Sequence, residues 1–471
     1  MMSVEQLRSR VLGQVLVPSD AGYEIARMVA NRRVDRHPAV VARCAGPCDV
    51  VAVLRYAQER GLPVAVRGGG QNVAGWGTCD DGIVVDLSPM KAVRVDVAAR
   101  ATAAQPGVTW DEFDAATQRF GLAAPGGHGP EVSIAGYTLG GGIGELSRTL
   151  GLACDNVESF DVVTAAGRQI RVDAGEHPDL FWALRGGGGN FGVVTSLRFR
   201  VHPVTDITCG PMVFAADQTA AALKAARDWV SAAPDAASFC AVAWTAPPVP
   251  FVPETFQFEP CLLLLPSWSG RPEEAQRVLA PLRATAPAPA LDAVRRIPYS
   301  TYPSFFRRPS GMGRYQAYAR GELLRELGDS TIDDLVNGWR AASPQVSIVL
   351  GALGGAIGRV GRDETAFAHR DAAWFVECNA QWRPGIPGED LIRIVRQLWQ
   401  ALAPVTAGPY VNLLPDPEPE WVRAAYGPTH LARLVAVKTT YDPDNVFRFN
   451  ANIRPDSSPP VTRSISDSVH Q

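Results

Sequence analysis

Four clusters of glycine separate short apolar segments between residues 39 and 203, and they constrain the fold more than any other feature of the chain. They lie at Gly68–Gly70, Gly126–Gly127, Gly140–Gly144 and Gly186–Gly192. Because glycine has no Cβ, such a segment can turn tightly and present several backbone N–H groups to one anion. A single cluster is equally consistent with a tight turn alone. Four clusters in one region predict loops that close around an extended ligand.

The segments between the glycine clusters predict six short strands, and two helical patterns interrupt them. The helices are expected at Pro47–Arg60 and Thr109–Phe120. The strands are expected at Val64–Val66, Ile83–Leu87, Val93–Val95, Phe160–Thr164, Ile170–Val172 and Val193–Val201. This mixture predicts an α+β domain over residues 1–204.

The sequence pattern changes near residue 205. From there, segments rich in Ala and Arg predict helices between apolar strands such as Cys261–Leu265 and Trp374–Trp382. The helices are expected at Thr219–Ala232, Glu273–Ala284, Thr331–Ala342, Glu389–Leu402 and Trp421–Tyr441. We therefore expect a substrate-binding domain over residues 205–430, built as an antiparallel sheet covered by helices. The tail at 457–471 is rich in Ser, Pro and Asp and is predicted to be disordered.

Charge and composition exclude several classes of partner. The chain has 45 basic and 48 acidic residues and no long basic run, so nucleic acid is not an expected partner. No apolar stretch is long enough to span a bilayer, and the first residues lack the hydrophobic segment of a secretion signal, so a cytoplasmic location is expected. None of the eight cysteines forms a CxxC pair, so free thiols are favoured over a disulfide or metal clip at Cys44 and Cys48, and no metal site is predicted. No pattern indicates an oligomeric state.

The segment Gly187-x-Gly189-x-x-Gly192 formally matches the GxGxxG fingerprint of dinucleotide-binding folds. That fingerprint requires a strand before it and a helix after it, so that the helix N-terminus faces the phosphates. Here the order is reversed, because a helical pattern at Asp179–Leu184 precedes the glycines and the strand Val193–Val201 follows. The sequence therefore argues against a Rossmann site.

Three longer segments contain or follow these glycines: PGGHGPEVSIAGYTLGGGIGELSRTLGLACDNVESFDVVTAAG at 125–167, HPDLFWALRGGGGNFGVVTSLRFRVHP at 177–203, and YVNLLPD at 410–416 with YDPDNVFRFNANI at 441–453. In this order they resemble the berberine bridge enzyme family, within the vanillyl-alcohol-oxidase-like group. The resemblance covers nearly the whole chain. It implies FAD as the cofactor and a PCMH-type FAD-binding domain that residues 431–456 rejoin.

The resemblance also implies which residues hold FAD. The pyrophosphate is expected on Arg67, Gly68, Gly69, Gly70, Gln71 and Asn72. Further contacts are expected from Gly75, Gly126, Val132, Gly140, Gly141, Gly142, Gly144, Asp155, Asn156, Val157, Gly187, Gly192 and Val194, and from Asn450 and Asn452 near the C-terminus.

Both positions that tether flavin covalently in relatives differ here. Relatives carry a histidine where this chain has Gln71, and many carry a cysteine where it has Gly129. The resemblance thus predicts FAD held without a covalent bond. His128 adjoins the cysteine position, but a histidine in a turn is the favoured interpretation over an alternative attachment point. The family's oxygen-gating position is Val132, whose small side chain favours molecular oxygen as the electron acceptor.

Tyr410 is the predicted catalytic base, because relatives carry a Tyr-x-Asn motif here whose tyrosine faces the flavin, and Asn412 would fix the loop. A tyrosine packed after Gly408-Pro409 is the alternative. Strand alternation places Glu377, Asn379 and Gln381 on one face of Trp374–Trp382 with Phe375. That face lines a wet cleft or is solvent-exposed, so Glu377 is a second-choice base. Possible substrate-shaping aromatics, with core packing as the alternative, are Tyr302, Tyr315 and Tyr318.

The sequence thus predicts an FAD-dependent oxidase of a small or medium organic substrate, such as a sugar, glycoside, alkaloid or other secondary metabolite. The substrate would lose a hydride to flavin and a proton to a base, and oxygen would be reduced to hydrogen peroxide. An oxidative cyclase, or a dehydrogenase with another acceptor, is one alternative. A degenerate flavoprotein that binds ligand without turnover is another.

Overall fold

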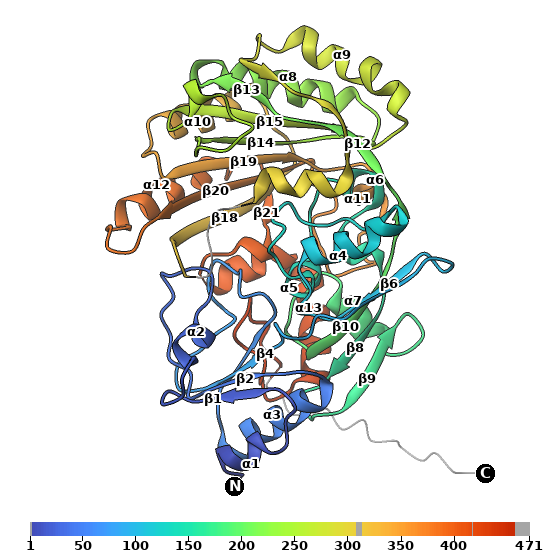
Figure 1. Cartoon of the computed structure of the whole chain (residues 1–471), viewed down its shortest axis with the longest axis vertical. Helices are drawn as coiled ribbons and strands as arrows, with labels where there is room; N and C mark the ends of the chain where they lie inside the picture. Colours follow the sequence, from blue (N-terminus) through green and yellow to red (C-terminus); the bar gives the residue numbers. More distant parts are fainter. Residues whose placement is uncertain (1, 308–312, 417, 457–471) are drawn as a thin grey trace, which may run out of the picture.

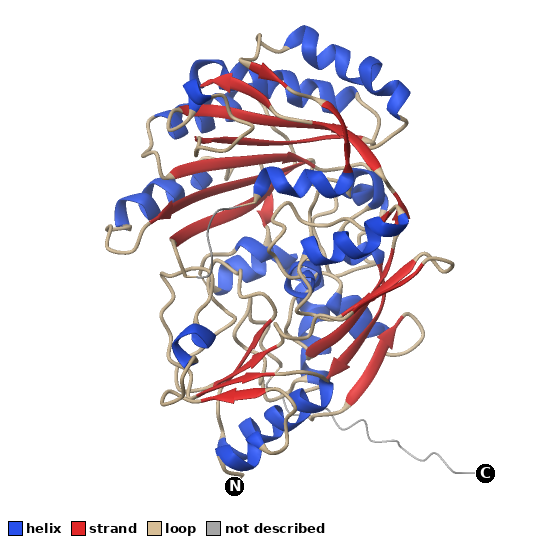
Figure 2. Cartoon of the chain, viewed as in Figure 1, coloured by secondary structure: helices blue, strands red, loops and turns tan. Residues whose placement is uncertain are grey.

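The computed structural model describes residues 2–307, 313–416 and 418–456. Two parts are stacked along the long axis of Figure 1, one built around a large antiparallel sheet and one around two smaller sheets. Figure 2 shows helices on one face of the large sheet and the smaller sheets beyond its other face. The predicted tail at 457–471 lies outside the described residues.

The first smaller sheet carries the glycine loop at Gly68–Gly70 on its edge. Its strand order is β1 (Gln14–Leu16), β2 (Val40–Arg43), β4 (Ile83–Asp86) and β3 (Val64–Arg67). β4 runs parallel to both β2 and β3. The crossover between β2 and β3 is α3 (Pro47–Arg60), which begins with proline at its first turn and ends at Gly61 in the left-handed conformation. Short helices α1 (Val4–Arg8) and α2 (Tyr23–Arg27) flank this sheet.

The second smaller sheet is antiparallel and supports the remaining glycine loops. Its order is β5 (Val93–Asp96), β6 (Ala101–Ala104), β10 (Val193–Arg200), β8 (Val157–Val163) and β9 (Gln169–Asp173). The connecting elements are α4 (Trp110–Thr117), β7 (Leu122–Ala123), which pairs with β11 (His202–Pro203), α5 (Ile134–Leu139), α6 (Ser147–Leu150) and α7 (Pro178–Leu184). The helix predicted over Thr109–Phe120 is divided, because a 3₁₀ turn at Gln118–Phe120 follows α4.

The large sheet is antiparallel and uses strands from residues 206 to 409. Its main order is β16 (Leu291–Asp292), β13 (Met212–Ala215), β15 (Pro260–Trp268), β14 (Ala237–Thr245), β19 (Val346–Ala352), β20 (Trp374–Trp382), β18 (Gln316–Leu324) and β21 (Thr406–Pro409). In addition, β12 (Asp206–Cys209) pairs with β15, and β17 (Arg295–Pro298) pairs with β12. One face is covered by α8 (Thr219–Ala232), α9 (Ala275–Thr285), α10 (Asp329–Arg340) and α12 (Glu389–Gln400). This confirms the predicted α+β class and helix-covered sheet.

The last long helix, α13 (Pro419–Tyr441), returns the chain to the smaller sheets, with a break at Gly427. The ammonium group of Lys438 is fully buried and donates to Asp442 and to the carbonyls of Asn190 and Phe447. Phe447 then forms a parallel bridge with Val64 of β3. The C-terminal segment is thus fastened to the first part of the fold, and we propose the domain limits at residues 204 and 430 on that basis.

Candidate active site

Tyr410 lies buried where the large sheet meets the glycine loop after α5. It follows the last residue of β21, and its N–H donates to the Gly321 carbonyl of β18 at 2.9 Å. Its hydroxyl accepts hydrogen bonds from the N–H of Gly142 at 3.1 Å and from the amide of Asn412 at 2.8 Å. Burial raises the pKa of Tyr410 to about 12, while these N–H donors favour the phenolate and act in the opposite direction. The phenol is therefore protonated at neutral pH.

Asn412 links this junction to α5 through its side-chain amide. Its amide donates to the carbonyl of Tyr137 at 2.9 Å as well as to Tyr410. A Cβ at Gly140 would overlap the Asn412 side chain, and Gly142 has a φ of +86° that disfavours other residues. The glycine loop and the Tyr-x-Asn segment can approach only because these positions are glycine.

Glu377 lies on the same face of the large sheet as Tyr410, with one glycine between them. Glu377 of β20 pairs with Gly321 of β18. The strand on the other side of β18 is β21, and Tyr410 is the residue that follows it. Two strand spacings put the Cα atoms of Glu377 and Tyr410 roughly 10 Å apart. On this face the ring of Phe375 meets Tyr410 at 5.8 Å, and Asn379 is buried and donates to Glu377 at 3.1 Å. A freely solvent-exposed face is therefore not observed.

In the first glycine loop the backbone N–H groups are the groups available to a ligand, because the Arg67 side chain is bonded to other parts of the protein. The Arg67 guanidinium is buried and bonds to Asp86 at 2.9 Å and to the Ala26 carbonyl at 2.6 Å. Residues 68–72 are all half-buried, and the Gly69 N–H donates to the Ser133 hydroxyl at 2.8 Å. Arg67 thus holds the end of β3 in place. Any phosphate at this loop would meet N–H groups and not the Arg67 charge.

Gly75, Gly126, Gly144 and Val132 shape the neighbouring loops through close packing. A Cβ at Gly75 would overlap Val34, one at Gly126 would press on Trp110, and one at Gly144 would overlap the Gly126 carbonyl. Val132 is half-buried, and its carbonyl accepts from the Trp110 N–H at 3.0 Å. The structure therefore brings the 126–132 and 140–144 loops together.

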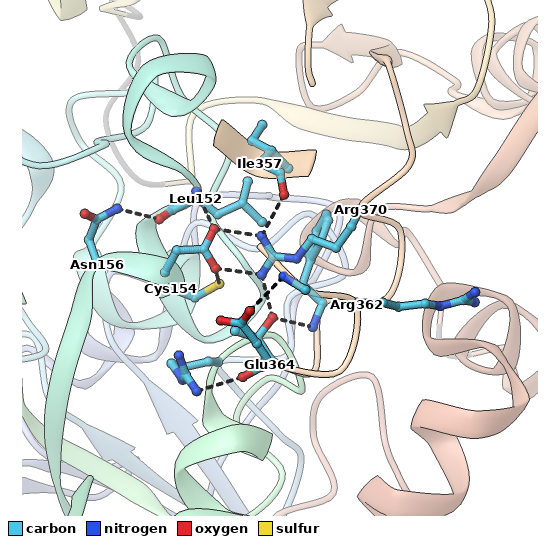
Figure 3. A network of polar contacts seen from close by, with 12 residues as sticks. Leu152, Cys154, Asn156, Ile357, Arg362, Glu364 and Arg370 are labelled. Carbon is cyan, nitrogen blue, oxygen red and sulfur yellow. Dashed lines mark hydrogen bonds and ion pairs between the residues drawn. The ribbon is translucent and has the colours of Figure 1, made fainter. Parts of the chain in front are cut away.

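The predicted cofactor residue Asp155 uses its carboxylate within the protein, where it meets Leu152 and Arg370, both labelled in Figure 3. Arg370 donates to both carboxylate oxygens, at 2.7 and 2.6 Å, and the Leu152 N–H donates at 2.8 Å. Asn156 donates to the carbonyls of Leu150 and Leu152 through its amide nitrogen, and its Oδ1 accepts a hydrogen bond from His202 Nε2 at 2.7 Å. These two side chains position the turn before β8 and leave its backbone to contact a ligand. Val157 begins β8 and is buried.

The last glycine loop meets the C-terminal segment. Asn190 donates to the Ala451 carbonyl and accepts from the Ile453 N–H, while Asn450 donates to the Gly189 carbonyl at 3.2 Å. A Cβ at Gly187 would overlap the Ala183 carbonyl, and one at Gly192 would overlap Val162, so both close the turn between α7 and β10; Val194 is buried in β10. The reversed helix–glycine–strand order predicted from the sequence is confirmed.

The residues present fit a ligand of FAD's length and polarity. Several oxygens in or beside these loops are buried with no hydrogen-bond partner among the described residues, among them Glu131 Oε2, Thr138 Oγ1 of α5, Asn450 Oδ1 and Asn452 Oδ1. An unpaired buried polar atom costs roughly 1–3 kcal/mol, so several in one group of loops are expected where a ligand completes the bonding. The half-buried backbone at 68–72 adds N–H groups for a pyrophosphate.

Sequence reasoning missed a buried carboxylate, Glu145, beside these loops. Its two oxygens accept hydrogen bonds from Ser267 of β15 and from Tyr302, and His128 Nε2 lies 3.6 Å away. His128 lies in a bend between β7 and α5, in agreement with the interpretation favoured from the sequence, and has the Glu145 carboxylate as a neighbour. Only the position of Glu145 one residue after a glycine cluster could have drawn attention to it. Tyr302 and Tyr318 are both buried, in agreement with core packing.

All eight cysteines are free thiols, and each except Cys48 is buried, which confirms the predicted free thiols. Among the described residues, no helix is long and apolar enough to cross a membrane.

Known proteins match both parts of this arrangement. The family described as FAD binding domain matches residues 38–173, and the family described as berberine and berberine like matches residues 409–454. The uncharacterized FAD-linked oxidoreductase YgaK of Bacillus subtilis is 32% identical over 470 residues, which cover 97% of this chain and 99% of the relative. The chain belongs to the berberine-bridge-type FAD-linked oxidoreductases.

A further sequence match and a solved structure agree with this assignment. The (R)-6-hydroxynicotine oxidase of Paenarthrobacter nicotinovorans is 30% identical over 467 residues, covering 95% of this chain and 98% of the relative. The crystal structure of 6-hydroxy-D-nicotine oxidase from Arthrobacter nicotinovorans superposes with a TM-score of 0.84 at 28% identity, covering 95% of this chain and 98% of that chain. This oxidoreductase is thus an FAD enzyme with the PCMH-type fold, as predicted.

Proposed function

We propose that this oxidoreductase is an oxidase of a small or medium organic substrate, with Tyr410 as its proton acceptor and FAD held by contacts alone. FAD would be held by the loops at 68–72 and 140–144 and would supply a hydride acceptor, with molecular oxygen as the final oxidant and hydrogen peroxide as its product. The observation that carries the proposal is the Tyr410 hydroxyl, held by Asn412 and the N–H of Gly142 where the large sheet meets the predicted cofactor loops.

Tyr410 can take a proton because N–H donors point at its oxygen and stabilise the phenolate. Burial opposes them and keeps the phenol protonated in the free protein, so the reactive fraction grows with pH. Glu377 is the second candidate base on the same sheet face.

The relatives support a small-molecule substrate, since one of them is a 6-hydroxynicotine oxidase. Sugars, glycosides, alkaloids and other secondary metabolites remain in the proposed class. Substrate screening with a peroxide assay separates an oxidase from a dehydrogenase that uses another acceptor. Product analysis identifies oxidative ring closure. Tyr410, Asn412 and Val132 together argue against a flavoprotein without turnover.

Non-covalent FAD is proposed because neither tethering position offers a nucleophile. The Gln71 amide lacks the imidazole nitrogen that bonds to flavin in relatives, and Gly129 has no side chain. Precipitation of the purified protein with acid should leave the yellow colour in the supernatant. Colour that remains with the pellet contradicts the proposal. Gln71→His, treated in the same way, should retain colour in the pellet if the pocket geometry matches that of tethered relatives.

A further inference from the structure

A cavity of about 520 Å³ lies beside β21, between the edge of the large sheet and the break in α13. Arg320 and Glu322 of β18 contribute to its wall, whereas Gly321 between them faces Tyr410. Side chains alternate along a strand, so the cavity and the Tyr410 hydroxyl lie on opposite faces of the sheet. The cavity is thus separate from the predicted cofactor and substrate region.

Arg320 lines this cavity, and its relative exposure is only 4%. Its guanidinium carbon lies 4.0 Å from the ring centroid of Trp399 and 4.2 Å from that of Trp421. Nε donates to Glu322 at 2.6 Å, and Thr406 donates to the other oxygen of that carboxylate at 2.7 Å. Nη1, however, is buried with no hydrogen-bond partner among the described residues. The Arg320 side chain is therefore fixed in place with one donor still unused.

The remaining charges around the cavity leave it positive. Arg325 is 3.4 Å from Asp371, so these two charges balance. Arg362 and Arg423 also line the cavity, and no carboxylate among the described residues pairs with either. Burial lowers the pKa of His369, which keeps that ring neutral at pH 7. Four arginines thus face two carboxylates, and the two uncompensated arginines are exposed.

We propose that this cavity binds a small organic molecule that carries a carboxylate or phosphate group. The planar guanidinium groups match the geometry of both oxyanions. Ala403, Pro409 and Pro428 supply apolar wall for the rest of the molecule, and the volume lies within the range of small-molecule sites. The site is independent of the proposed oxidase function, since Arg320 lies on the sheet face opposite Tyr410.

Isothermal titration of the FAD-loaded protein tests this proposal with benzoate, inorganic phosphate and the neutral benzamide as probes, at constant ionic strength. At least one of the two anions should bind saturably with one site per chain, and benzamide should not. Arg423→Gln and Arg362→Gln should each weaken that binding about tenfold, which corresponds to about 1.4 kcal/mol. Arg277→Gln on α9 is the matched control, because it removes the same charge from a side chain that is 75% exposed and far along the sequence.

The two anions distinguish a carboxylate ligand from a phosphate ligand. Binding of benzoate alone indicates a carboxylate ligand, binding of phosphate alone a phosphate ester, and binding of both a general oxyanion site. Absence of saturable binding by either anion overturns the proposal. Binding that survives both arginine substitutions, or that Arg277→Gln weakens equally, also overturns it. The flavin absorbance of each variant reports that the protein is folded, and the substituted arginines are exposed, so loss of binding is not loss of fold.

Discussion

The two faces of the large sheet differ in what they bury. The helix-covered face packs Leu264, Val376 and Cys378 into one apolar cluster with α8, α9, α10 and α12. The opposite face carries Glu377, Asn379 and Tyr410 toward the glycine loops. Along β20 these two sets alternate residue by residue. On β20, the side chains that face the helices stabilise the fold, and those that face the glycine loops are candidates for catalysis. The two roles can coexist because the apolar packing under the helices does not involve the side chains of the other face.

Tyr410→Phe is the substitution with the largest expected effect on the Tyr410 face. Loss of a positioned proton acceptor typically lowers turnover by about 10²–10⁴-fold. The wild-type rate should rise with pH, since the reactive phenolate is the minor form below a pKa of about 12. Flavin reduction measured by stopped flow over a pH series checks both expectations.

Glu377→Gln is the matched control on that face and should reduce flavin reduction less than tenfold. If this substitution abolishes reduction and Tyr410→Phe does not, Glu377 is the base and the assignment of Tyr410 is wrong.

Leu264→Ala addresses the helix-covered face. Leu264 is fully buried in the apolar cluster, so its truncation should lower the free energy of unfolding by about 2–5 kcal/mol. Urea unfolding measures this loss. The rate of flavin reduction per folded molecule should stay close to that of the wild type. A comparable loss of rate would show that the two faces are not independent.

Tyr410 should also make the free energy of unfolding fall at alkaline pH, and Tyr410→Phe should remove this pH dependence. Its pKa of about 12 in the folded protein exceeds the ordinary value of 10, so its contribution to stability is complete below pH 10 and is lost as pH rises through 12. At pH 11 this loss amounts to roughly 1.4 kcal/mol. Urea unfolding of both proteins at pH 9 and pH 11 gives the difference. An equal loss in the two proteins would contradict the assignment.

Ser347→Ala should have the smallest effect. The Ser347 hydroxyl donates to Asn379 at 2.9 Å, and its removal should cost about 1 kcal/mol or less because Ser347 itself is half-buried. Thermal unfolding measures the change. A loss as large as that of Leu264→Ala would mean that polar contacts on the Tyr410 face support the fold as strongly as the apolar cluster does.

Local patterns in the sequence predicted much of the fold. The limits of α3, α8 and β20 agree with the structure to the residue. The start of α9 lies two residues after the expected one, because a 3₁₀ turn occupies Pro272–Glu274. α10 begins two residues before the expected start, at Asp329. Period and turn chemistry are properties of neighbouring residues, so they can be read without knowledge of the tertiary contacts.

The sequence by itself determined the alternation of β20, the glycine loops, the reversed GxGxxG order and the absence of a tethering residue at Gln71. Only the tertiary structure decided how charged side chains are used. Arg67 meets Asp86, Asp155 meets Arg370 across 215 residues, and the hydroxyl of Tyr410 meets Gly142 across 268. Glu145 and the Arg320 cavity likewise arise from long-range contacts. A charge acquires its role from its partner, and partners so distant in sequence leave no local pattern.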